Sequence, residues 1–454
     1  MPPTFRSASA PRTLGILGLP IHDVTLPGTL ALFDSALAVR TPQFCVALEP
    51  AHLAALPTDP ELLRTLCAAE LVLAADPRIA SAASGAGIQL LEALEAPTLL
   101  DTLIAHAAVH GLRTFAVGSS AEALARFCDN AALRHPGFAA TATATLPSAN
   151  PHAPESLPLV DSIREHRIDL LLIDLPIPER EKWIAMHHSG TGVPWTIGIS
   201  LRLPGEPAPA AGWAERWNTR SLLRARASLQ RKLCSAPQAA RTSIEWEIRP
   251  DGSMLHLRAP DLIEGQLPQA TLAAVQTRRA GDQILVDLSR LSALGTGGLG
   301  TLFTLAHTAL RQAALLHITK PQQAVAQALK GLGLDPLFPL LDPSRTPATA
   351  SSGEITARGF SVRSRPPLEL TAATAGPFRQ GVEERWAEAT DALQLIVEMQ
   401  GVRFMDSSGL GVLLALRRLT EQRQGARFII EGITPAVQSV IRLAQLEEVF
   451  GLNQ

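Results

Sequence analysis

Two stretches of the chain, QILVDLSRLSALGTGGLGTLFTL at 283–305 and QLIVEMQGVRFMDSSGLGVLLAL at 394–416, align without a gap. The offset of 111 residues (394 − 283) places Gly300 on Gly411. Each stretch begins with an apolar run typical of a buried strand and continues into an apolar pattern of helical period. We therefore predict that the C-terminal half of the chain is an internal repeat of two α/β units.

The preceding part of the chain alternates short apolar runs with helical stretches. The apolar runs predict strands at 13–19, 44–48, 71–75, 113–118, 168–175 and 195–200. The stretches between them predict helices at 26–39, 59–69, 98–110, 120–131 and 179–187. Residues 140–160, rich in Ala, Thr, Pro and Ser, predict a loop that interrupts the pattern. Such alternation predicts a parallel sheet covered by helices.

The length of 454 residues allows two to four domains. The repeat and the composition divide the chain into 1–237, 240–341, a linker at 342–359 and 360–454. The predicted fold class is α/β, with an N-terminal Rossmann-like domain followed by two small α/β domains.

Composition and charge exclude several classes of protein. The 40 basic and 42 acidic residues give a net charge of −2, whereas nucleic-acid binders usually carry a basic face. The four cysteines are far apart with no C-x-x-C spacing, and His106 and His110, four residues apart, lack a third ligand, so we expect no metal and no cofactor. The sequence shows no signal-peptide core and no apolar run long enough to span a bilayer, which predicts a cytoplasmic protein.

The glycine-rich segments allow several interpretations. Residues 295–300 match G-x-G-x-x-G, but no acidic residue follows at the distance that a dinucleotide site requires, so we interpret them as a tight turn before a helix. In the second repeat the corresponding residues include Asp406 and Ser407. Asp406 is either a structural helix cap or the neighbour of a phosphoacceptor serine, Ser407, whose phosphate would face the positive end of a helix.

The second repeat resembles the STAS domain of bacterial anti-sigma-factor antagonists, through F-x-DSSGLGVLL and QGARFIIEGITPAVQSVIRLAQLEEVF. The resemblance implies that a serine kinase or another STAS-binding protein is a partner, and that Ser407 is phosphorylated. The first repeat resembles a second, diverged STAS domain. There Gly295 replaces the acid and Thr296 replaces the serine, so Thr296 is a weaker candidate and a scaffold role is favoured.

The N-terminal part resembles the WecG/TagA/CpsF glycosyltransferases in successive blocks over about 14–235, the best of which is PEREKWI at 178–184. That resemblance implies transfer of an N-acetylhexosamine from a UDP-sugar to a polyprenyl-diphosphate-linked acceptor, with inversion. Asp76 matches the family's proposed general base, although proline follows it here instead of glycine. Arg180 stands where the family has glutamine, while Glu181 is kept, and both are candidate contacts to the nucleotide sugar. Arg180 either contacts phosphate or forms a surface ion pair with Glu179 and Glu181, which flank it.

We expect further contacts to a nucleotide sugar from a turn after a predicted strand. Gly118, Ser119 and Ser120 lead into a helix, where free N–H groups could face a diphosphate, although an ordinary turn explains them as well. The basic stretch 220–233 predicts either a helix at an anionic membrane surface or a solvated helix whose leucines pack on the core.

These features favour one function and leave two alternatives. The leading hypothesis is a STAS regulatory protein that carries a diverged glycosyltransferase domain, phospho-switched and linked to cell-surface polysaccharide synthesis. One alternative is an active inverting glycosyltransferase with a STAS regulatory tail, so enzyme activity stays open. The other is a domain that only binds a nucleotide sugar and reports it to the STAS pair. No nucleic-acid partner is expected, and membrane contact would be peripheral, at the inner face.

Overall fold

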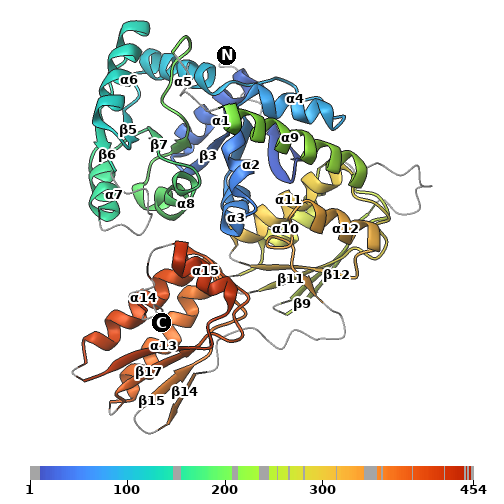
Figure 1. Ribbon diagram of the computed structural model, residues 1–454, viewed down its shortest axis with the longest axis vertical. Helices are drawn as coiled ribbons and strands as arrows, with labels where there is room; N and C mark the ends of the chain where they lie inside the picture. The colour runs from blue at the N-terminus through green and yellow to red at the C-terminus, as the bar shows by residue number, and fades with distance from the viewer. Residues whose placement is uncertain are drawn as a thin grey trace, which may run out of the picture.

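The computed structural model describes most of the chain. Described residues are 11–146, 155–206, 213–234, 245–341, 355–358, 361–443, 446, 449 and 450, apart from 253, 264–265, 280–281, 313, 391 and 424. The predicted boundary at 237 and 240 and most of the predicted linker lie outside these residues. The prediction of an α/β fold is confirmed in all three parts of the chain (Figure 1).

The N-terminal domain is built on a six-stranded sheet in which every pair of neighbours is parallel. The strand order is β4-β3-β8-β7-β5-β6. The strands are β3 (Gln43–Leu48), β4 (Leu71–Ala74), β5 (Thr114–Gly118), β6 (Ala142–Thr145), β7 (Leu170–Asp174) and β8 (Trp195–Gly198). All of them except the edge strand β6 are largely buried, because helices cover both faces of the sheet.

Helices form a layer on each face of this sheet. One layer consists of α1 (Leu26–Val39), α5 (Ala96–His110) and α6 (Ala121–Arg134). The opposite layer consists of α2 (Pro50–Ala55), α3 (Pro60–Ala68), α4 (Pro77–Gly85), α7 (Ser156–Glu165) and α8 (Glu179–Thr191). Successive residues of β3 enter the two cores alternately, Phe44 on one side and Cys45 on the other, as the pleat requires. The five predicted helices of this domain are confirmed.

Two sequence predictions for this domain are wrong. Residues 13–19 do not add a strand to the parallel sheet, because β1 (Arg12–Ile16) and β2 (Leu19–Asp23) pair with each other as an antiparallel hairpin. Leu17 and Gly18 form its turn with φ of 56° and 81°, the two positive values that a tight hairpin turn needs. The predicted loop 140–160 contains β6, which is an edge strand of the sheet, and the start of helix α7.

The first repeat forms a five-stranded sheet with the order β13-β12-β11-β10-β9. Its strands are β9 (Glu247–Asp251), β10 (Met254–Arg258), β11 (Gln283–Asp287), β12 (Leu315–Thr319) and β13 (Leu340–Leu341), and its helices are α10 (Gln269–Gln276), α11 (Thr296–Arg311) and α12 (Gln323–Gly331). The β9–β10 pair is antiparallel and the other pairs are parallel.

The second repeat forms a four-stranded sheet, β14-β15-β17-β19, and a small parallel pair, β16-β18. Its strands are β14 (Ile355–Arg358), β15 (Ser361–Ser364), β16 (Glu369–Leu370), β17 (Gln394–Glu398), β18 (Phe404–Met405) and β19 (Arg427–Glu431). Its helices are α13 (Ala372–Glu388), α14 (Ser407–Glu421) and α15 (Pro435–Leu443). Strand β14 falls within the predicted linker, where residues 355–358 pair with β15 instead of connecting domains.

The N-terminal hairpin packs directly on α11 of the first repeat. A Cβ atom at Gly300 would lie 2.0 Å from the carbonyl oxygen of Thr13, and one at Gly15 would lie 2.3 Å from the Leu299 side chain. Both glycines are therefore needed for the close approach of strand and helix. One continuous hydrophobic core joins the N-terminal domain to the first repeat.

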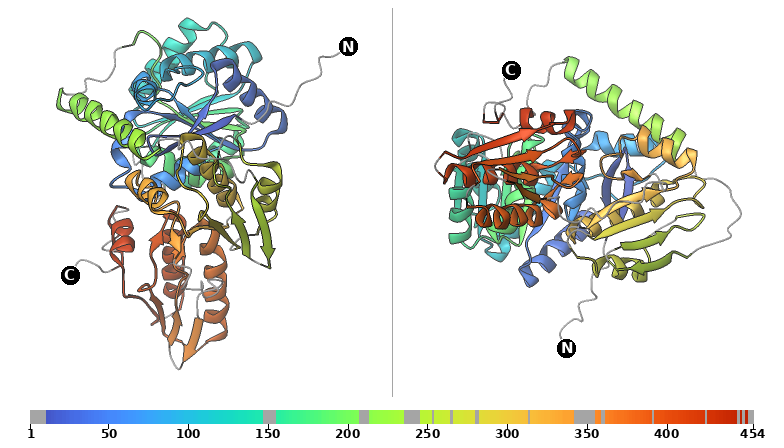
Figure 2. Two further views of the ribbon diagram at one scale, coloured as in Figure 1. Left: turned by 90° about the vertical axis from the view of Figure 1, so that its right-hand side faces the viewer. Right: turned by 90° about the horizontal axis from the view of Figure 1, so that it is seen from below.

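The second repeat has a core of its own, which includes Phe378, Trp386 and Leu413. It lies below the other two parts in the view of Figure 1 and at the end of the molecule in the left panel of Figure 2. The chain thus folds as a fused pair of domains with a third domain attached to it.

Candidate functional site

The carboxyl ends of the parallel strands bring most of the predicted site residues to one edge of the N-terminal sheet. Gly118 is the last residue of β5, and Asp76 follows β4 by two residues. Arg180 and Glu181 open α8, shortly after β7. In open parallel sheets this edge is where ligands bind.

Asp76 and Gly118 lie far apart along that edge. Strands β3, β8 and β7 separate β4 from β5 in the sheet. Four strand spacings of about 4.8 Å put the two strand ends about 19 Å apart. A single ligand would have to span this distance to touch both residues.

The neighbours Gly118 and Asp174 mark a point where the chain direction switches. They are register partners on β5 and β7. After Gly118 the chain turns through α6 to β6, whereas after Asp174 it turns through α8 to β8, on the other side. Such a switch point is the usual place of a binding crevice in this architecture. Asp174 is not among the residues predicted from the sequence, although an acid near the end of the apolar run IDLLLIDL at 168–175 is a usable signal.

Arg180 and Glu181 form a buried charge cluster on α8. Arg180 Nε lies 2.7 Å from Glu181 Oε1, and Arg180 Nη1 lies 3.4 Å from Oε1 of Glu49, the residue after β3. His52 Nε2 lies 3.1 Å from the same Glu181 oxygen. Gly198 on β8 provides the space, because a Cβ atom there would lie 3.1 Å from both Arg180 Nε and Glu181 Oε1. Arg180 is thus paired with the carboxylates of Glu49 and Glu181.

Burial and nearby charge shift the pKa values of two acids at this edge of the sheet in opposite directions. Burial by itself raises the pKa of Glu181, but the charges of Arg180 and His52 outweigh it and bring that pKa down to about 2. Burial raises the pKa of Asp174, although this carboxylate accepts a hydrogen bond of 2.9 Å from the N–H of Leu201 and lies near Arg180. Glu181 is therefore a fixed anion at neutral pH, and it is suited to hold Arg180 in place.

Asp76 caps α4 and pairs with Arg78. Its Oδ1 accepts hydrogen bonds from the N–H of Arg78 at 2.8 Å and from Arg78 Nε at 2.9 Å, and its Oδ2 lies 2.7 Å from Arg78 Nη2. Pro77 occupies the first helical position, and Asp76 has the extended backbone expected before proline. Both carboxylate oxygens are engaged within the chain, whereas a general base needs an oxygen free for the acceptor hydroxyl.

The turn after β5 has the form of an ordinary helix start. Ser119 and Ser120 are exposed, and Ser120 caps α6 by accepting a hydrogen bond of 3.4 Å from the N–H of Ala123. Gly118 lies against Leu124, because a Cβ atom there would lie 3.1 Å from that side chain. The turn offers N–H groups at the switch point, and it also fits the alternative that it is an ordinary turn with no ligand.

The two repeats differ at the start of the equivalent helices. In the second repeat, Asp406 caps α14 and accepts hydrogen bonds from the N–H groups of Ser408 at 2.9 Å and Gly409 at 3.0 Å. Ser407 is the first residue of α14, and its side chain lies outside the described part of the structure. In the first repeat, Gly295 caps α11 without a side-chain bond, and Thr296 follows it, half-buried.

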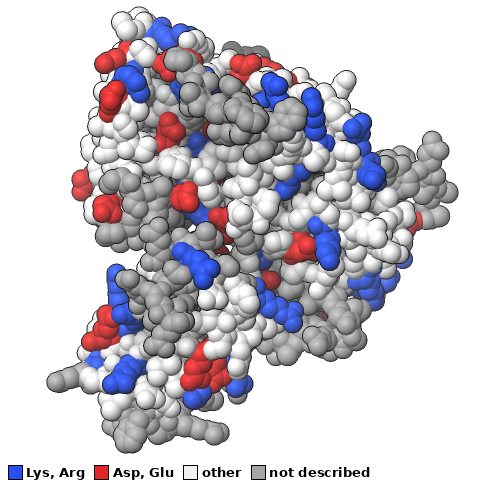
Figure 3. Space-filling model, viewed as in Figure 1, with Lys and Arg blue, Asp and Glu red and all other residues white. Residues whose placement is uncertain are grey.

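The basic stretch 220–233 lies within α9 (Trp213–Leu233), whose buried face packs on both fused domains. On that face Gln230 bonds to the N–H of Leu17 and the carbonyl of Gly15, and Arg226 donates to the carbonyl of Leu17. The exposed basic side chains of the stretch are Arg220, Arg224, Arg231 and Lys232. Figure 3 shows basic residues at the upper right, where Figure 1 places α9. Among the described residues, no helix combines the length and apolar character needed to cross a bilayer.

Comparisons with known proteins match all three parts of the chain. The model of the glycosyl transferase WecG/TagA/CpsF family matches residues 14–224. A family model described as Mlab, STAS domain matches 257–342, and the STAS domain model matches 365–454. One solved structure, described as the anti-sigma factor antagonist SpoIIAA in its unphosphorylated form, covers 20% of this chain and 82% of that chain at 22% identity, with a TM-score of 0.18.

Proposed function

Because the chain consists of a WecG/TagA/CpsF-family glycosyltransferase domain followed by two STAS domains, we propose that it is a phospho-switched regulator or scaffold of cell-surface polysaccharide synthesis. The switch is Ser407, phosphorylated by a serine kinase of the anti-sigma type or controlled through another STAS-binding protein. The protein acts in the cytoplasm, and the exposed basic face of α9 allows peripheral contact with anionic lipid.

One observation carries this proposal. The polar groups expected to serve catalysis are engaged within the chain, Asp76 by Arg78 and Arg180 by Glu181. By contrast, the D-S-S-G start of α14 keeps an acidic cap that presents the backbone of Ser407 at a helix N-terminus. A phosphate at this position is favoured by the helix dipole and changes the local charge by about −1.5 to −2.

The test compares variants at position 407 for binding to candidate partners. Full-length protein with Ser407→Ala or Ser407→Asp is used to capture candidate kinases and polysaccharide enzymes, and the retained amounts are quantified. We expect at least one partner to distinguish the two variants by about tenfold or more, which corresponds to about 1.4 kcal/mol. Equal retention of every partner by both variants would contradict the switch.

The second candidate is an active inverting glycosyltransferase. Glu181 Oε2 supports it, because this buried oxygen has no hydrogen-bond partner within the described residues and could accept a bond from a ligand hydroxyl near the switch point. The test measures UDP release from a UDP-N-acetylhexosamine with a polyprenyl-diphosphate-linked acceptor, for the wild type and Asp76→Ala. Turnover that Asp76→Ala abolishes would favour the enzyme. Saturable UDP binding in calorimetry without turnover would favour a sensor of the nucleotide sugar.

A further inference from the structure

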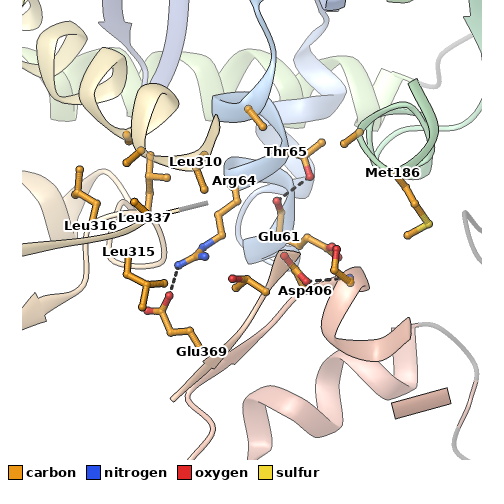
Figure 4. Close-up of a pocket in the computed structure, with 17 residues that line it drawn as sticks. Glu61, Arg64, Thr65, Met186, Leu310, Leu315, Leu316, Leu337, Glu369 and Asp406 are labelled. Atoms are coloured by element: carbon orange, nitrogen blue, oxygen red, sulfur yellow. Dashed lines mark hydrogen bonds and ion pairs between the residues drawn. The ribbon is translucent and has the colours of Figure 1, made fainter. Parts of the chain in front are cut away.

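Arg64 on α3 joins all three parts of the chain at one point (Figure 4). Its Nε donates a hydrogen bond of 3.0 Å to the carbonyl of Pro336 in the first STAS domain. Its Nη2 lies 3.0 Å from Glu369 Oε2 in the second STAS domain, and its guanidinium lies 4.0 Å from the ring centre of Phe404. The side chains of Arg64 and Glu369 are largely shielded from solvent, at 12% and 15% exposure, which strengthens their attraction.

The two STAS domains are attached by different kinds of contact. The first shares a hydrophobic core with the transferase domain, through the hairpin on α11. The second keeps its own core, and it meets the other domains through the polar contacts of Arg64 and through a contact between α14 and α8. Small polar contacts between domains are typical of reversible association, whereas a shared apolar core is permanent.

The start of α14 faces this same junction. Asp406 and Ser408 line a cavity of about 190 Å³ together with Glu61 and Arg64 of α3 and Met186 of α8. Helix α14 also contacts α8 directly. The transferase domain therefore lies against the two residues that flank position 407.

We propose that the transferase domain is an intramolecular partner of the second STAS domain, held by Arg64, and that phosphorylation at residue 407 releases it. This inference rests on the proposed function for its second half only. In the step itself, the γ-phosphoryl group of ATP forms a P–O bond to the serine oxygen, ADP leaves, and the hydroxyl proton is released. The released domain then exposes the D-S-S-G surface to an external partner.

Charge explains the direction of the switch. Besides Arg64, the charged residues lining the cavity are Glu61, Glu369 and Asp406, all of them acidic. Lys182 of α8 pairs with Glu61 and also with Asp59, so acidic groups still outnumber basic ones at this point. A phosphate on the adjacent residue 407 adds about −1.5 to −2 charges to this group. Repulsion then opposes the docked arrangement, and kinases act on the fraction of molecules that is open.

The first experiment measures the radius of gyration of the full chain by small-angle X-ray scattering. A compact chain of this length has a radius of about 22 Å. We expect Arg64→Glu and Glu369→Arg each to increase it by several ångströms, and the double variant with both changes to regain most of the compactness. Arg134→Glu is the matched control, because Arg134 also binds one carboxylate and one carbonyl, Asp101 and Pro204, but both lie within the transferase domain. Circular dichroism establishes that each variant is folded.

The second experiment places phosphoserine at position 407 by codon suppression and compares it with Ser407→Ala. We expect expansion of the phosphorylated chain and no change for alanine. An unchanged radius in Arg64→Glu would overturn the docking, and expansion in Arg64→Glu without expansion in the phosphoserine protein would overturn the release. Failure of the proposed function is seen separately, as equal partner binding by the Ser407 variants.

Discussion

Replacing Gly300 by alanine tests whether the N-terminal hairpin and the first STAS domain form one unit. The new Cβ atom would lie 2.0 Å from the carbonyl oxygen of Thr13 and 3.0 Å from the Cα atom of Leu14, while ordinary contacts begin at 3.4 Å. Strand β1 would have to move by about 1.4 Å (3.4 − 2.0), and the obstructing atoms are backbone, which cannot rotate away.

The matched control is the equivalent glycine of the second repeat. Gly300 is the fifth residue of α11 and Gly411 the fifth residue of α14, but among the described residues nothing outside the backbone of α14 lies within 4 Å of a Cβ at Gly411. Alanine in a helix interior is favoured over glycine by about 1 kcal/mol at either position. This gain cancels in the comparison, so the difference between the variants isolates the packing term.

We expect Gly300→Ala to be less stable than Gly411→Ala by about 1–3 kcal/mol, with the upper end favoured because backbone must move. The assay is thermal unfolding by calorimetry, combined with hydrogen exchange of peptides from β1, α11 and α14. In Gly300→Ala we expect faster exchange in β1 and α11 and unchanged exchange in α14. Equal unfolding temperatures for the two variants, with unchanged exchange in β1, would refute the close packing of hairpin and helix.

Two further predictions concern buried ionisable groups. Arg180→Met leaves the buried carboxylate of Glu181 with His52 as its remaining charged partner, so we expect a loss of about 3–5 kcal/mol, whereas Arg180→Met with Glu181→Met should cost much less. Denaturant unfolding followed by tryptophan fluorescence, to which the buried Trp183 contributes, checks both. His22 has a pKa lowered by burial from 6.5 to about 4 and accepts a hydrogen bond from the N–H of Val72. Because burial disfavours the protonated ring in the folded state, the contribution of neutral His22 to the free energy of unfolding is complete above pH 6.5. It is lost as the pH falls toward 4, and the loss between pH 7 and pH 5 is about 1–2 kcal/mol. Denaturation midpoints at these pH values should differ less in His22→Gln, and an equal difference would exclude His22 as the cause.

Local patterns predicted most of the secondary structure. The helices at 26–39, 59–69 and 98–110 are found as α1, α3 and α5, because helix starts and apolar periodicity depend on neighbouring residues. The hairpin was missed because TLGILGL reads as one continuous apolar strand. Its turn depends on Leu17 adopting a positive φ, which β-forming sequence alone does not indicate.

The candidate site was predictable only in part. The order of strands and helices suffices to bring Asp76, Gly118 and Arg180 to one edge of a parallel sheet. The burial of Arg180 was not predictable, since its partners Glu49 and Glu181 are recruited from different elements and Gly198 provides the space. The sequence had suggested a surface ion pair or a phosphate contact for Arg180, and the structure places it instead in a buried network.

By itself, the sequence determined the repeat, the α/β fold of each part and the residues that the repeats share. It could not determine why Gly300 and Gly411, identical in the alignment, have different surroundings, nor that Arg64 joins three domains. Those properties depend on Thr13, Pro336 and Glu369, which lie far away along the chain. The physical reason is that helix and strand formation is decided by local backbone preferences and apolar periodicity, whereas close packing and ion pairing are decided by whichever distant surface the folded chain brings within a few ångströms.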